Sequence, residues 1–162
     1  ARNKPQITQI KIMKKIIVIA SAVIAILYSI YIVIGASEFL ITGRWNCGIY
    51  PLTAKDYIIG IIVIIISLLI ILISALVIFN VKPTKLLMIF AKICFAMFGL
   101  ILCIHILGWI FNCIFVELFG VIIGRNEPSV FIINGLPIVM VIITLLIYIR
   151  RAKLPAGVKK NK

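Results

Sequence analysis

One uninterrupted apolar segment constrains the fold of this chain more than any other feature. Residues 58–79 read IIGIIVIIISLLIILISALVIF and contain no ionisable side chain. About 20 apolar residues, each rising 1.5 Å along a helix, cross a hydrocarbon core that is about 30 Å thick. Lipid offers no hydrogen-bond partner to the backbone, so such a segment has to be helical.

Three further segments have the same character, and together they predict spans at about 16–36, 57–79, 86–107 and 130–149. The expected fold is an all-α integral membrane protein, a tetraspan bundle over residues 16–149 between basic segments at 1–15 and 150–162. The chain is 64% hydrophobic and 13% charged, whereas soluble domains average about 45–50% and about 25%. This composition excludes an ordinary soluble domain.

The charged residues predict the orientation of the spans. Lysines and arginines give a net charge of +13 and gather in the segments 1–15, 82–85 and 150–162. The acidic residues all fall in the other two connections: Glu38, Asp56, Glu117 and Glu127. By the positive-inside rule, an even number of spans places both termini in the cytoplasm. Because the basic residues flank apolar runs, they indicate membrane topology and anionic lipid contact rather than nucleic-acid binding.

The third apolar run is too long for one crossing. It extends from Leu86 to Ile123, which as a single helix is about 57 Å. Two crossings in this run would place the basic C-terminus outside. We therefore expect one crossing, with residues 108–123 either extending the third helix or lying in the outer interface.

Polar residues interrupt the third and fourth spans and are candidate functional or interface residues: Lys92, His105, Asn112, Glu117, Asn134 and Pro137. At 100° per residue, Cys94, His105 and Asn112 share one helix face, and Lys92, Gly99, Cys103 and Glu117 lie nearly opposite. We therefore expect protein on both faces of the third span. Lys92 is close enough to the cytoplasmic end to extend to the headgroups, and Pro137 predicts a kink beside Asn134.

The cysteines limit the chemistry of the chain. Its 4 cysteines include no CxxC pair, which argues against a thiol oxidoreductase. Cys47 and Cys113 are both expected on the outer side, where they form either a disulfide or two free thiols. Cys103 and His105 point in different directions around the helix, so no metal site is expected. The sequence predicts no catalytic residue and no cofactor, although a bound lipid fits the pattern.

Small residues recur at helical spacing and predict close helix contacts, because lipid gives helices no hydrophobic reason to associate. The predicted packing residues are Ser21, Ala25 and Ser29 in the first span, Gly60, Ser67 and Ser74 in the second, and Gly99 and Cys103 in the third.

These observations favour a non-enzymatic accessory subunit of a larger membrane complex, with other membrane subunits or further copies of the chain as partners. One alternative is a redox or metal-linked enzyme that uses outer residues Cys47, His105, Cys113 and Glu117. Another is a small oligomeric transporter or channel. The expected location is a prokaryotic plasma membrane or the endoplasmic reticulum membrane of a eukaryote.

Overall fold

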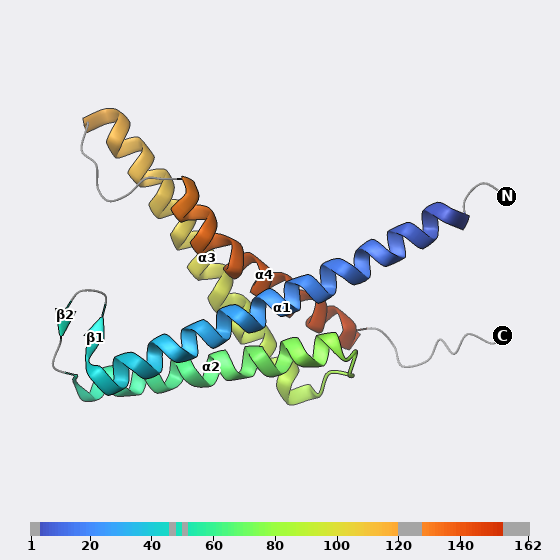
Figure 1. Ribbon diagram of the computed structural model, residues 1–162, viewed down its shortest axis with the longest axis horizontal. Helices are drawn as coiled ribbons and strands as arrows, with labels where there is room; N and C mark the ends of the chain where they lie inside the picture. Colours follow the sequence, from blue (N-terminus) through green and yellow to red (C-terminus); the bar gives the residue numbers. More distant parts are fainter. Residues whose placement is uncertain (1–3, 46–47, 50–51, 120–127, 154–162) are drawn as a thin grey trace. The chain divides into compact units, whose positions relative to one another are not determined.

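The protein is a chain of long helices in the computed structural model, which describes residues 4–45, 48–49, 52–119 and 128–153 (Figure 1). The helices are α1 (Lys4–Thr42), α2 (Ala54–Ile78), α3 (Lys85–Phe119) and α4 (Pro128–Lys153). Contacts divide the chain into two units, Ala1–Lys82 and Pro83–Lys162. Each unit is a helical hairpin, α1 with α2 and α3 with α4.

Backbone chemistry at the first connection ends α1 and starts α2. Gly43 adopts a φ of 65°, and its N–H donates to the Phe39 carbonyl at 2.9 Å. This left-handed conformation costs glycine little and stops the helix. The chain then forms a two-residue antiparallel pair, β1 (Arg44–Trp45) with β2 (Gly48–Ile49). These strands are not evident from the sequence, since two residues are too few to show an alternating pattern.

The turn between α2 and α3 is likewise formed by the backbone conformation of a few residues. Asn80 has a φ of 56°, and the Val81 N–H donates to the Leu76 carbonyl at 3.0 Å. Asparagine tolerates the left-handed region better than other side chains do. Pro83 follows and cannot continue the helix. Residues 79–84 therefore terminate α2 sharply before α3 begins.

The α1–α2 hairpin packs through small side chains. Its buried residues include Ser21, Ala22, Ala25 and Ser29 on α1, and Gly60, Ser67, Ile70, Ile73, Ser74 and Val77 on α2. Near the turn, Leu40 lies directly over Gly60, where an added Cβ would meet the Leu40 side chain at 2.6 Å. Small residues let two helix backbones approach closely, and this approach is what stabilises helix pairs in lipid.

The α3–α4 hairpin packs through larger side chains. On α3 the buried residues are Ala91, Cys94 and Phe98, and on α4 they are Ile138, Val141, Thr144, Leu145 and Tyr148. Steps of three and four residues place each set on one helix face. Pro137 lies inside α4, one residue before this buried face begins.

The helix bounds refine the predicted spans. Three helices have segments long and apolar enough to cross a membrane: Ile12–Thr42, Ala54–Ile78 and Lys85–Phe111. The structure continues α1 back to Lys4, so most of the basic segment 1–15 is helical. It also continues α3 without a break to Phe119. Of the two arrangements expected after residue 107, the described chain therefore adopts the helix extension.

Candidate functional site

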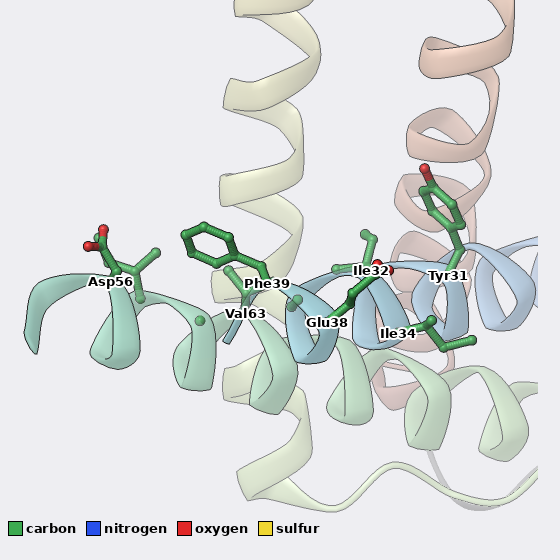
Figure 2. A pocket seen from close by; sticks show the side chains of 11 residues that line it. Tyr31, Ile32, Ile34, Glu38, Phe39, Asp56 and Val63 are labelled. Atoms are coloured by element: carbon green, nitrogen blue, oxygen red, sulfur yellow. The ribbon is translucent and has the colours of Figure 1, made fainter. Parts of the chain in front are cut away.

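A groove between α1 and α2 is the candidate binding site of the first hairpin (Figure 2). Its volume is about 700 Å³, within the range of about 300–1,000 Å³ that is usual for small-molecule sites. The groove is lined by Tyr31, Ile32, Ile34, Gly35, Ala36, Glu38 and Phe39 of α1, and by Asp56, Ile59, Gly60 and Val63 of α2. The lining is mostly apolar, with acidic residues but no basic ones.

Two glycines shape this groove in different ways. At Gly60 the Leu40 side chain fills the space beside the backbone and brings α1 onto α2. At Gly35 an added Cβ would meet nothing within 4 Å. Leu40 therefore closes the hairpin at one point, while Gly35 leaves the neighbouring space open.

Asp56 is held in place by the start of α2. Its Oδ2 accepts hydrogen bonds from the Thr53 N–H at 2.8 Å and from the Thr53 hydroxyl at 2.7 Å. The carboxylate thereby satisfies a backbone donor at the helix N-terminus, as the acidic residue of a capping box does. Both hydrogen bonds favour the charged form of the carboxylate.

Glu38 supplies the second carboxylate of the groove, from α1. Figure 2 shows Glu38 between Phe39 and Ile32 along α1, with Asp56 beyond Phe39 on α2. The Tyr31 ring is 73% exposed at the edge of the groove. The groove therefore combines a mostly apolar lining with two separate carboxylates.

This groove is not evident from the sequence, where Glu38 and Asp56 indicate only the orientation of the spans and Tyr31, Gly35 and Phe39 carry no motif. One available signal was the scarcity of acidic residues, 4 in 162, of which two flank the first connection. The open space beside Gly35 has no signature in the sequence.

A second surface of interest lies on α3, away from α4. Ala96 and Cys103 are exposed, Gly99 is half-buried, and an added Cβ at Gly99 would meet nothing within 4 Å. We call these three residues the α3 small-residue stripe. Lys92, one turn before it, is also exposed. The next face around the helix carries large aliphatic side chains that are exposed in this unit, including Leu100 and Ile104.

The other predicted polar residues have varied surroundings. His105 is half-buried, and its ring lies 3.6 Å from the position of a Cβ on Gly135 of α4. Pro137 is half-buried inside α4. Asn112, Glu117 and Asn134 belong to helices, but their side chains lie outside the described residues.

The cysteines of α3 also differ in their exposure. Cys94 is buried against α4 and Cys103 is exposed, and both are free thiols. Cys47 and the Cys113 side chain lie outside the described residues, and so does the disulfide expected between them. Within the described part of the chain, no three His, Cys, Asp or Glu side chains gather to hold a metal ion.

The predicted packing residues of the first two spans are all buried between α1 and α2. Ser21 and Ser67 donate their hydroxyls to carbonyls of their own helices, Val18 at 3.1 Å and Val63 at 2.8 Å. The hydroxyls of Ser29 and Ser74 are buried without a hydrogen-bond partner among the described residues. The packed interface between α1 and α2, which we call the α1–α2 seam, is therefore close-packed rather than joined by these serine hydroxyls.

No protein-family model, curated protein or solved structure matches this chain.

Proposed function

We propose that this chain is a small, non-enzymatic structural subunit of a larger membrane complex. All four helices cross the membrane in this proposal, and both termini lie in the cytoplasm. Three helices have the length and apolar character of spans. The 26 residues of α4 rise about 39 Å, which is also enough for a crossing.

The α3 small-residue stripe is the observation that carries the proposal. Small residues at a helix surface have no advantage against lipid tails, because they bury less contact area than leucine or isoleucine does. They do have an advantage against another helix, since they allow the backbones to approach. On α3 the stripe lies away from α4, the helix that packs on α3 in this unit. We infer that a further helix covers it.

Lys92 supports the same conclusion. A charged side chain on a lipid-facing helix surface costs free energy unless it reaches the headgroups or a polar partner. Lys92 is exposed on the same side of α3 as the stripe. A partner helix that packs on the stripe is well placed to offer it an acceptor.

The exposed basic residues support contact with anionic lipids at the cytoplasmic face. They include Lys14, Lys15, Lys82, Lys85 and Arg150. Each lysine or arginine close to an anionic membrane surface contributes about 1 kcal/mol to the attraction. This contribution anchors the termini and the α2–α3 turn on the same side of the bilayer.

Extraction of the chain from its native membrane in a mild detergent tests the proposal. We expect a particle much larger than the 18.1 kDa chain with its detergent, containing at least one other polypeptide or further copies. A folded, monodisperse monomer without a co-purifying partner would contradict the proposal.

Two matched variants sharpen this experiment. Gly99→Leu adds a large side chain on the stripe, and we expect it to release the chain from the complex while its helix content is preserved. Leu100→Phe adds volume on the neighbouring face, where Leu100 is 63% exposed, and should leave the complex intact. Equal effects of the two variants would show that the stripe is not a protein contact.

A further inference from the structure

The first turn of α3 presents backbone hydrogen-bond donors at the surface of the second hairpin. Thr84, Lys85 and Leu86 are exposed. The N–H groups of Lys85 and Leu86 lie in the first turn, where helix geometry gives them no carbonyl partner. The Leu87 N–H is 3.4 Å from the Thr84 hydroxyl, which is long for a helix cap. The start of this helix therefore combines open donors with the positive end of the helix dipole.

A buried tyrosine hydroxyl lies at the same end of the hairpin. Tyr148 of α4 is 0% exposed, and its hydroxyl lies near the Thr84 backbone. This hydroxyl has no hydrogen-bond partner among the described residues. Buried polar groups are nearly always hydrogen-bonded in native proteins. The Tyr148 hydroxyl therefore points to an acceptor that the described chain does not supply.

Positive charge flanks these donors, and negative charge is absent from the neighbouring sequence. Lys82 and Lys85 are exposed beside the turn. Arg151 follows Tyr148 by three residues and therefore lies on a similar face of α4. The sequence has no acidic residue between Asp56 and Glu117 and none after Glu127. An anion matches this end of the hairpin better than water does, because it accepts hydrogen bonds and also balances the cations.

The position of these donors along the helices identifies the class of anion. A segment with the character of a membrane span begins at Lys85, and α4 ends at Lys153, five residues after Tyr148. In the proposed topology both ends lie where the hydrocarbon core meets the headgroups. Lipid phosphates are the anions at this depth, and helix N-termini bind phosphate through their free N–H groups.

We propose that the start of α3 binds the phosphate of an anionic phospholipid. The ligands are the N–H groups of Lys85 and Leu86, the Tyr148 hydroxyl and the side chains of Lys82 and Lys85. The hydroxyl is covered in the structure, so the phosphate reaches it through a small movement of the turn at residues 79–84. Binding is non-covalent. The inference rests on the proposed function only for the crossing of α3 and α4 and does not require a partner subunit.

Native mass spectrometry of the purified full chain in detergent tests the proposal. Phosphatidylglycerol is titrated, and phosphatidylcholine, which carries the same phosphate but no net charge, is the reference lipid. We expect the first phosphatidylglycerol to bind more tightly than further ones and more tightly than phosphatidylcholine. Millimolar inorganic phosphate should not displace it. Displacement would mean that the site holds a free anion and would overturn the assignment to a lipid.

Matched variants test the hydroxyl separately from the charge. Tyr148→Phe removes only the hydroxyl and should weaken the first phosphatidylglycerol by about threefold to tenfold, the effect of one hydrogen bond. Tyr57→Phe is its control, because Tyr57 is 46% exposed at the far end of α2 from this turn. Lys85→Gln should weaken binding by about fivefold. Lys14→Gln removes the same charge from α1 and should have a smaller effect. Circular dichroism shows that each variant keeps its helices.

Hydrogen exchange in nanodiscs locates the bound lipid. Phosphatidylglycerol should slow exchange of the amides at residues 84–86 relative to phosphatidylcholine, and Tyr148→Phe should reduce this protection. Unchanged affinity of Tyr148→Phe, or equal losses in Lys14→Gln and Lys85→Gln, would overturn the proposal, since charge alone would then account for the attraction. The experiments use the isolated chain, so these outcomes are independent of whether a partner subunit is found.

Discussion

The two helical hairpins are held together by opposite kinds of side chain. Between α1 and α2 the seam is built largely from serine, alanine and glycine, and Leu40 lies on bare backbone at Gly60. Between α3 and α4 it includes Phe98, Leu145 and Tyr148. In lipid neither seam gains from the hydrophobic effect. The α1–α2 seam therefore depends on close approach of the two backbones, and the α3–α4 seam depends more on interdigitated side chains. On the far side of α3, the α3 small-residue stripe is the surface to which we assign a partner helix in the proposed complex.

The largest expected effect comes from adding volume to the α1–α2 seam. Gly60→Ile forces Leu40 aside and should destabilise the hairpin by about 1–3 kcal/mol, the usual cost of overpacking. Unfolding of the purified chain in nanodiscs measures this loss. Gly108→Ile adds the same side chain to an exposed glycine and should change stability much less. A similar loss in both variants would contradict the close packing of α1 on α2.

Removing volume should be the more harmful change in the α3–α4 seam. Leu145 is fully buried, and Leu145→Ala leaves a cavity. The transfer term is small because lipid also surrounds the separated helices, so we expect a loss of about 1–2 kcal/mol from the cavity alone. Ala25→Gly in the α1–α2 seam is the matched comparison, and the same unfolding measurement should show a smaller loss. If Leu145→Ala has no effect, the two seams do not differ as described.

The first turns of α2 and α3 give a smaller contrast. Asp56 accepts a 2.8 Å hydrogen bond from the Thr53 N–H, whereas the Leu87 N–H is 3.4 Å from the Thr84 hydroxyl. Asp56→Ala should therefore loosen the first turn of α2, as losses of good helix caps do. Thr84→Ala should have a smaller effect on α3. Hydrogen exchange of the amides in the first turn of each helix measures the effect of each variant. Equal increases in exchange for Asp56→Ala and Thr84→Ala would show that the Asp56 cap is no stronger than the Thr84 contact.

The smallest effect is expected at the buried serines. Ser74 has a buried hydroxyl without a hydrogen-bond partner among the described residues, while the Ser67 hydroxyl donates to the Val63 carbonyl. Removing an unsatisfied polar group is nearly neutral or stabilising, so Ser74→Ala should change stability by less than about 0.5 kcal/mol. A clear loss in thermal unfolding, larger than that of Ser67→Ala, would mean that Ser74 bonds across the seam.

Much of the helical architecture could be predicted, because apolar length alone requires helices in lipid. The described structure has a helix at each of the four predicted spans, and three of these helices have the character of membrane spans. The bounds were less accurate. Helix α1 extends to Lys4, since lysine and glutamine are good helix formers in water and allow a span to continue beyond the bilayer.

The groove could not be predicted, because it depends on how two helix surfaces diverge around Leu40. Helical phase did place Cys94 and His105 on one face of α3 and Gly99 and Cys103 on another. Helical phase could not determine which of these faces meets α4. In the structure it is the face of Cys94 and His105, since Cys94 is buried and the His105 ring lies beside Gly135 of α4.

Site-specific photo-cross-linking in native membranes tests the central claim that another protein covers the α3 small-residue stripe. A photoreactive amino acid is introduced at Cys103 on the stripe, and separately at Ile104 on the neighbouring aliphatic face, about 100° around the helix. We expect position 103 to form a discrete adduct with a second polypeptide and position 104 to react mainly with lipid. Lipid adducts alone at both positions, or links from position 103 only to α1 or α2 of the same chain, would contradict the claim.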